Sequence, residues 1–198
     1  MWPLLFCSVL VLFVVLERFV FWFTIDLQRN QSLLDEILEL CRQGMWDQVR
    51  EKVRGSRDYI IRILVIGIVH REYSMSKAME SATTEQLQKM GRFMGILDTM
   101  ITVAPLLGIL GTVIGIIDSF EILGTSGIDD PRAVTGGIAQ ALITTATGLA
   151  IAIFSVFPFN YFRSRLRRAA HGIEQYATSL EIVYGKLGQD SNQTGNEQ

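Results

Sequence analysis

The chain has 198 residues, of which 49% are hydrophobic and only 19% are charged, and its mean hydropathy is +0.30. Soluble domains carry about 25% charged residues, so this composition excludes a disordered chain, a collagen-like chain and a disulfide scaffold, and it favours a membrane protein. The formal net charge of −2 provides no basic field for a phosphate backbone, which excludes nucleic-acid binding.

The first apolar stretch runs from Trp2 to about Ile25 and is long enough to cross a bilayer as a helix. It lacks a positively charged leading region and an A-x-A-like cleavage site, and apolar residues continue past Glu17 and Arg18. We therefore interpret it as an uncleaved membrane anchor rather than a signal peptide.

The region that follows carries helical patterns rather than the pattern of an enzyme domain. Apolar residues recur at helical spacing from Leu33 to Leu40, and Gly44 precedes a second segment at 46–53. This arrangement predicts a helical hairpin. The apolar segment 59–69 is about half the length of a span, so we expect it to form a packed helix outside the membrane.

A helical pattern from Ser81 to Ile96 leads into the second apolar stretch, which extends from Thr99 to about Ile117, and predicts one long helix that begins well below the membrane. The third stretch runs from about Ala133 to Phe162. Beyond about Gly185 the sequence is polar, and we expect it to be disordered. The expected organisation is a first span at 1–25, an inner helical region at 26–96, a second span at 97–122, an outer loop at 123–135, a third span at 136–162, and an inner helix with a disordered tail at 163–198.

Lysine and arginine are concentrated between the first and second spans and directly after the third, whereas 123–135 contains only Arg132. Positively charged connections remain on the cytoplasmic side of a membrane. We therefore expect the amino terminus and the short loop to face outward and the remaining regions to face inward. The basic cluster next to the third span is expected to anchor this orientation and to contact anionic lipids; it consists of Arg163, Arg165, Arg167 and Arg168.

Small residues form a stripe along the second span. Their spacing of i, i+3, i+4, i+7 and i+11 places them on one face of a helix, and Gly111-x-x-x-Gly115 is a small-xxx-small arrangement that lets another backbone approach. The stripe predicts a contact surface, either between two spans of one subunit or between subunits. Its members are Gly108, Gly111, Thr112, Gly115 and Ser119.

The third span repeats the small residues and adds polar groups. Its small positions are Gly137, Ala141, Gly148 and Ala152, and its polar groups are the hydroxyls of Thr144, Thr145 and Thr147 and the amide of Gln140. Together with Thr112 they predict a slightly polar strip that holds a few waters or faces a protonatable group on another chain.

Carboxylates and histidines are absent from the central parts of both spans. Asp98 and Asp118 lie near opposite ends of the second span, where contact with headgroups or solvent explains them. We therefore expect any titrating carboxylate to come from a partner protein.

No motif in the sequence indicates catalysis or a cofactor. Cys7 and Cys41 fall on different sides of a predicted membrane boundary, so we expect no disulfide, and His70 and His171 are isolated, so no metal site is expected. The chain also lacks a P-loop and a recognisable pair of nucleophile and base. The sequence therefore predicts that the protein is not an enzyme.

The run Ala-Pro-Leu-Leu-Gly-Ile-Leu-Gly-Thr-Val-Ile-Gly-Ile at 104–116 and the run Gly-Ile-Ala-Gln-Ala-Leu-Ile-Thr-Thr-Ala-Thr-Gly-Leu at 137–149 resemble the MotA/TolQ/ExbB proton-channel family. Three spans, an outward amino terminus and a large inner region are similar to ExbB and TolQ rather than to MotA, which has four spans. The segment Trp2-Pro3-Leu4-Leu5 with the later Glu17-Arg18 favours ExbB. The resemblance covers essentially residues 1–165.

This resemblance implies a homopentamer in the bacterial inner membrane, whose second and third spans line a pore around the single spans of an ExbD- or TolR-like partner that carries a protonatable aspartate. The functional threonines of the family fall on Thr112 and Thr145, and its helix-bending proline on Pro105. Where ExbB and TolQ commonly carry a glutamate, this chain has Gln140. The expected pore lining is Thr112, Gln140, Thr144 and Thr145, and the residues expected to set packing and pore shape are Pro105, Gly108, Gly111, Gly115 and Gly148.

The prediction is an all-α membrane protein with three transmembrane helices and extended cytoplasmic helices that assembles as a ring. As an ExbB-like subunit of a proton-channel motor it would use proton motive force to energise a TonB-type or Tol-type system for outer-membrane transport, with a TonB- or TolA-like protein as a further partner. The alternative is a non-conducting scaffold that assembles and stabilises partner membrane proteins, a role that Gln140 favours.

Overall fold

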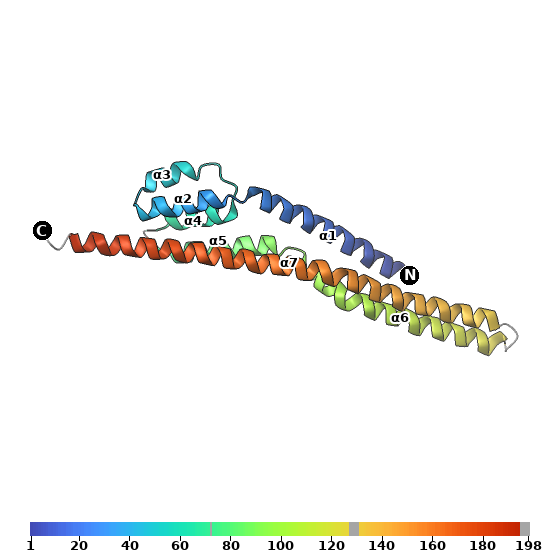
Figure 1. Ribbon diagram of the computed structural model, residues 1–198. Coiled ribbons are helices and arrows are strands. Elements are labelled where there is room, and N and C mark those ends of the chain that lie inside the picture. Colours follow the sequence, from blue (N-terminus) through green and yellow to red (C-terminus); the bar gives the residue numbers. More distant parts are fainter. Residues whose placement is uncertain (72, 127–130, 195–198) are drawn as a thin grey trace. The chain divides into compact units, whose positions relative to one another are not determined.

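The computed structural model describes residues 1–71, 73–126 and 131–194, and these residues form helices with no strand among them (Figure 1). The expected all-α fold is confirmed. The helices are α1 (Trp2–Gln28), α2 (Gln31–Arg42), α3 (Trp46–Lys52), α4 (Tyr59–Val69), α5 (Met75–Met90), α6 (Met94–Ser126) and α7 (Pro131–Thr194).

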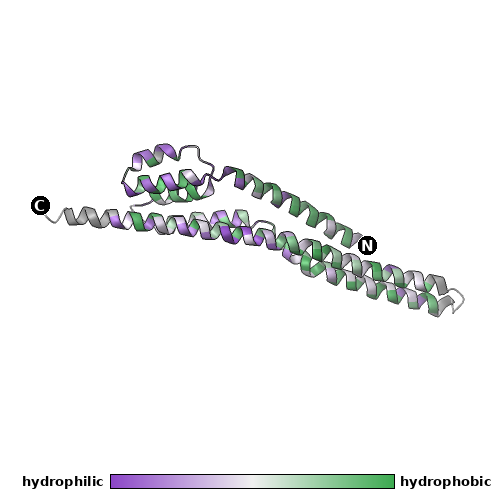
Figure 2. Cartoon of the chain, viewed as in Figure 1, coloured by the Kyte–Doolittle hydropathy of each residue, from purple (hydrophilic) through white to green (hydrophobic). Residues whose placement is uncertain are grey.

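Three of the helices are long and apolar enough to cross a membrane, as the sequence predicts: Trp2–Gln28, Met94–Gly124 and Val134–Lys186. Figure 2 shows α1, α6 and the adjoining part of α7 as mainly apolar, whereas α2, α3 and α5 mix polar and apolar residues. The chain divides into two units. Unit 1 contains Met1–Val20 and Phe93–Arg163, and unit 2 contains Phe21–Arg92 and Ser164–Gln198.

In unit 1, α1 buries one narrow face and exposes the rest. The buried residues alternate at spacings of three and four residues, which aligns them along one side of the helix. Large side chains such as Phe6, Phe13 and Phe19 are exposed on the other sides, as suits a helix surrounded by lipid. The buried face is formed by Leu4, Cys7, Val11, Val14 and Arg18.

The expected continuous helix from Ser81 into the second span is wrong. The N–H of Gly91 donates to the Leu87 carbonyl at 2.8 Å and ends α5, and Phe93 has a φ of +65° before α6 begins. A left-handed residue cannot continue a right-handed helix. The guanidinium of the buried Arg18 lies 5.6 Å from the centre of the Phe93 ring, and this contact helps to hold the break in place.

In unit 2, the predicted hairpin is confirmed as α2 and α3, which pack together around a turn at Gly44 (φ +71°). The apolar segment 59–69 is also confirmed as a packed helix, α4, which lies against α5. The contact is close because Gly67 lacks a side chain: a Cβ there would lie 2.6 Å from Cγ of Met79.

The start of α4 is held by Asp58, which is buried. One carboxylate oxygen accepts the Ile60 N–H at 2.8 Å and caps the helix, and the other accepts the Asn30 N–H at 3.0 Å. The Nε atom of Arg29 lies 3.9 Å from the same carboxylate, and Arg29 also donates to the Tyr59 hydroxyl at 2.9 Å. This network fixes the junction of α1 and α2 to the beginning of α4.

Both ends of α7 extend beyond the expected boundaries. The residues after Gly185 were expected to be disordered, but α7 continues through Thr194; residues 195–198 lie outside the described part of the chain. Adding residues to an existing helix requires no new nucleation, which favours this extension. Part of the expected loop 123–135 is also helical, because α6 continues to Ser126 and α7 begins at Pro131, while residues 127–130 lie outside the described part of the chain. Proline suits the first position of a helix.

Candidate functional site

The helices α6 and α7 lie side by side in unit 1 (Figure 1), and their small residues face each other. A Cβ at Gly148 would lie 2.5 Å from the Ala104 carbonyl oxygen, and a Cβ at Gly108 would lie 3.0 Å from Cα of Thr145. In the structure the stripe of small residues on α6 packs on α7 within one subunit, and its role in pore shape stays a prediction. We call this contact the α6–α7 seam; it contains Gly108, Gly111, Thr112, Gly115 and Ser119 of α6 and Gly137, Ala141, Thr144, Thr145 and Gly148 of α7.

Three threonine hydroxyls gather within the seam. The hydroxyls of Thr112 and Thr145 hydrogen-bond to each other, and they lie 3.1 and 3.0 Å from the carbonyl oxygen of Gly108. The Thr144 hydroxyl donates to the Ala141 carbonyl at 2.6 Å and lies 3.3 Å from the same Gly108 oxygen. The absent side chain of Gly108 is thus what lets hydroxyls of the facing helix reach a backbone oxygen of α6.

These hydroxyls differ in exposure. Thr144 is buried, whereas Thr112 and Thr145 are only partly buried. Part of the Thr112–Thr145 pair is therefore exposed at the surface of the subunit. Thr112 lies near the middle of the span Met94–Gly124 by residue number, and Thr145 faces it from α7. The structure therefore brings three of the predicted pore-lining residues into one polar cluster in otherwise apolar helices.

Pro105 lies inside α6, directly after the fully buried Ala104 whose carbonyl meets Gly148. Proline has no N–H to donate, so it breaks the regular hydrogen bonding of the helix at this point. The remaining predicted pore-lining residue, Gln140, is exposed and lies in the wall of a cavity that Thr144 also lines.

That cavity has a volume of about 480 Å³ and borders the seam on the side of Asp118. Gln140 and Thr144 of α7 line it together with Asp118 and Gly111 of α6. Sequence reasoning explained Asp118 by headgroup or solvent contact and did not connect it with Gln140. The available signal was its spacing: Asp118 follows Gly111 by seven residues and Gly115 by three, which places it beside the stripe of small residues.

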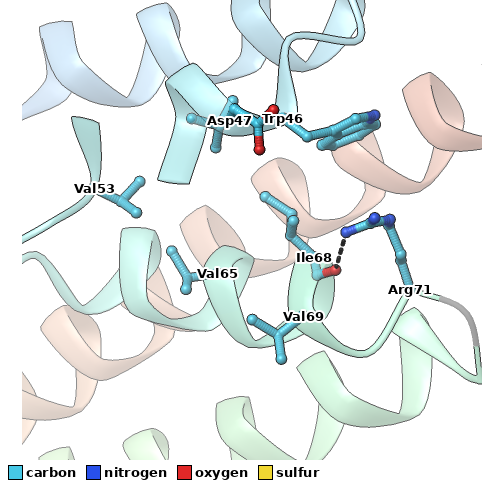
Figure 3. Close-up of a pocket in the computed structure, with 8 residues that line it drawn as sticks. Trp46, Asp47, Val53, Val65, Ile68, Val69 and Arg71 are labelled. Atoms are coloured by element: carbon cyan, nitrogen blue, oxygen red, sulfur yellow. Dashed lines mark hydrogen bonds between the residues drawn. The ribbon is translucent and has the colours of Figure 1, made fainter. Parts of the chain in front are cut away.

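A second cavity, of about 100 Å³, lies between α3 and α4 in unit 2 (Figure 3). Its walls are largely apolar, and Figure 3 shows Val53, Val65 and Val69 among them. The Arg71 guanidinium donates to the Ile68 carbonyl at 3.3 Å and lies 5.7 Å from the centre of the Trp46 ring. These two contacts hold the arginine side chain beside the cavity.

Burial perturbs two ionisable groups of unit 2. It raises the pKa of the Cys41 thiol to about 11, and it raises the pKa of Tyr59 above its usual value despite the nearby Arg29. Both shifts keep the group neutral and unreactive at physiological pH. Among residues 1–71, 73–126 and 131–194, no three His, Cys, Asp or Glu side chains are placed to hold a metal ion.

The basic cluster after the third span makes specific contacts within the protein. Arg165 forms an ion pair with Asp26 and lies 5.2 Å from the centre of the Trp22 ring, both on the final part of α1. Arg163 lies 5.9 Å from the ring of Phe159 on its own helix. At least Arg165 therefore joins α7 to α1 within unit 2, in addition to any role at a lipid surface.

Comparison with known proteins gives a consistent result. Residues 58–175 match a family model described as the MotA/TolQ/ExbB proton channel family. The chain is 34% identical to the biopolymer transport protein ExbB-like 3 of Synechocystis sp., with 93% of this chain and 90% of that protein covered. It is 39% identical to ExbB of Xanthomonas campestris over 46% of this chain and 36% of that protein, and 37% identical to TolQ of Pseudomonas aeruginosa over 46% and 39%.

Proposed function

The chain belongs to the MotA/TolQ/ExbB proton channel family, and on that premise we propose that it is an ExbB-like subunit of an inner-membrane proton-channel motor. The motor uses proton motive force to energise a TonB-type or Tol-type system for outer-membrane transport. Proteins of this family are channels or transport-energising proteins rather than known enzymes, and three apolar helices point to a multi-pass inner-membrane protein.

The hydroxyl cluster of the seam is the observation that carries this proposal. The paired threonines Thr112 and Thr145 are only partly buried, and Thr112 lies near the middle of its membrane span. Each hydroxyl oxygen can accept a further hydrogen bond while it donates to a carbonyl inside the subunit. In the proposed mechanism they hydrogen-bond the protonatable aspartate of an ExbD- or TolR-like helix, and Gln140 and Thr144 continue the polar surface.

The free energy available from each proton limits how far one transfer can move the partner helices. One charge that crosses 100 mV releases about 2.3 kcal/mol, a few times the thermal energy, so several protons drive each large movement of the enclosed helices. Pro105 and the glycines of the seam keep α6 and α7 at a fixed spacing, so that the path does not collapse between transfers. A TonB- or TolA-like protein then receives the movement.

The large exposed apolar surface of a single chain supports assembly into a ring of subunits. Only 11% of the most apolar part of α6 is buried, so lipid, further copies or the partner helices must cover its remaining surface. We propose a homopentamer with an outward amino terminus, in which 26–96 and the residues after the third span face the cytoplasm. The distribution of lysine and arginine supports this orientation.

The test is proton flux in liposomes that contain the subunit together with its single-span partner, at an imposed membrane potential. Thr112→Val and Thr145→Val keep the side-chain shape and remove one hydroxyl each, and we expect the double variant to lose at least nine-tenths of the flux. Thr147→Val is the matched control, because the Thr147 hydroxyl bonds only to Ile143 in its own helix at 2.7 Å. Full flux in the double variant would refute the proposed role of the hydroxyls.

The second candidate function is a non-conducting scaffold. It is favoured by the observation that packing of α6 on α7 accounts for the seam glycines and that every seam threonine finds an acceptor inside the subunit. A scaffold would copurify with its partner and stabilise it, yet liposomes containing both would show no proton flux. The identity of the copurified partner also decides between a TonB-type and a Tol-type system.

A further inference from the structure

The cavity beside the seam, which we call the seam cavity, lies between two helices of unit 1. Its walls come from six residues of α6, four of α7, and Met1, which precedes α1. At about 480 Å³ it has room for on the order of ten water molecules. The lining residues that matter here are Met1, Gly111, Asp118, Ser119, Gln140 and Thr144.

We propose that Asp118 is a proton-binding site of the channel subunit itself and that the seam cavity is the aqueous entrance through which protons reach it. The inference rests on the proposed function, and it adds a titratable group where the sequence suggested that any such group belongs to a partner. Its chemistry is a reversible proton transfer: the carboxylate takes a proton from water, becomes a carboxylic acid, and returns the proton to water deeper in the cavity.

The composition of the cavity wall singles out Asp118. It is the only ionisable side chain among the described residues that line the cavity, and it forms no ion pair with any residue that the structure describes. The facing residues of α7 are uncharged, and the amino group of Met1, which precedes α1, is the other ionisable group of that wall. Asp118 is exposed and lies near the end of its span, so water in the cavity can reach its carboxylate.

The other polar groups can complete a water-mediated path. The hydroxyls of Ser119 and Thr144 donate to the carbonyls of Gly115 and Ala141, at 2.7 and 2.6 Å. Each hydroxyl oxygen therefore keeps its lone pairs for a hydrogen bond from water. The amide of Gln140, in the wall of the same cavity, supplies both a donor and an acceptor without competing for the proton.

Thr144 links the seam cavity to the hydroxyl cluster. Its side chain lines the cavity, and its hydroxyl lies 3.3 Å from the Gly108 carbonyl oxygen that Thr112 and Thr145 also approach. Polar atoms therefore extend from Asp118 to the middle of the span. In the proposed orientation the Asp118 end of α6 faces outward, so the carboxylate meets the side from which protons enter.

The experiment compares three variants of the full chain, each reconstituted with its partner in liposomes. Asp118→Asn removes the titratable group at nearly constant shape, and we expect at least a tenfold loss of proton flux. Adding Gln140→Glu to this variant places a carboxylate on the opposite wall of the same cavity, and we expect it to restore at least half of the flux. Glu121→Gln is the matched control, since Glu121 belongs to the same end of α6 but does not line the cavity; we expect a change of less than twofold.

Wild-type flux in Asp118→Asn would overturn this inference and leave the proposed function intact, whereas absence of flux in the wild-type protein would overturn both. A loss of flux that Gln140→Glu does not restore would also count against a proton site in the cavity. A measurement on the wild-type protein is independent of variant folding: dicyclohexylcarbodiimide labels protonated carboxyl groups in apolar surroundings. We expect Asp118 to be labelled more than Glu121, and equal labelling of the two would refute the proposal.

Discussion

Replacing Gly148 by alanine tests whether α6 and α7 meet through their backbones. The added Cβ would lie 2.5 Å from the Ala104 carbonyl oxygen and 3.1 Å from Cα of Gly108. Both are backbone atoms, so no side-chain rotation relieves the clash. The two helices would have to separate by roughly 0.9 Å before the closest contact becomes an ordinary one.

Such overpacking costs about 1–3 kcal/mol in a well-packed interior, and separation also weakens the hydrogen bonds between Thr145 and Gly108. Gly136→Ala is the matched control in the same helix, because a Cβ there meets no atom within 4 Å. Replacing an unhindered helical glycine by alanine stabilises a helix by up to about 1 kcal/mol. The two variants should therefore differ in unfolding free energy by about 2–4 kcal/mol.

The assay is thermal unfolding of the detergent-solubilised protein, followed by circular dichroism at the same protein and detergent concentration. We expect a lower unfolding midpoint for Gly148→Ala, and an unchanged or higher midpoint for Gly136→Ala. If Gly148→Ala proves as stable as the control, then α6 and α7 do not approach each other through this glycine, and the geometry of the seam is wrong.

Two further predictions concern unit 2. With a pKa of about 11, against an ordinary value of 9.0, Cys41 should react with maleimide about a hundred times more slowly at pH 7.5 than a thiol of ordinary pKa, until the protein is unfolded; equal rates before and after unfolding would contradict its burial. Because the unfolded thiol ionises first, this group should also destabilise the fold as pH rises above about 9. Asp58→Ala should lower the unfolding free energy by about 2–4 kcal/mol, since it removes the cap of α4 and leaves the Asn30 N–H without an acceptor. Asp58→Asn keeps an acceptor oxygen and should lose less; equal losses in the two variants would argue against the cap.

The sequence predictions were correct where the structure depends on interactions between residues close together in the chain. The three spans were predicted correctly because a bilayer selects for length and apolarity, which are properties of a local segment. The stripe from Gly108 to Ser119 was predicted for the same reason, since the helical period alone aligns its members. The hairpin of α2 and α3 was visible from Gly44 and the apolar pattern around it.

Sequence reasoning was wrong where contacts between distant residues decide the outcome. The break between α5 and α6 depends on the left-handed conformation of Phe93, whose ring packs against Arg18 seventy-five residues earlier in the chain. The extension of α7 through Thr194 was hidden by a polar composition that is also typical of disorder. Sequence reasoning did not connect Asp118 with Gln140, because the two residues belong to different helices and their proximity depends on how those helices pack.

The amino-acid sequence by itself determined the membrane character of the protein, its helical content and its family, because hydrophobicity and helical periodicity act over short stretches of chain. The tertiary structure alone decided that the small stripes of α6 and α7 close on each other within one subunit. It also decided that Asp118 and Gln140 share the wall of one cavity. The physical reason is that a glycine in the sequence shows only that a side chain is absent at that position. Which backbone or polar group occupies the space depends on how the helices pack.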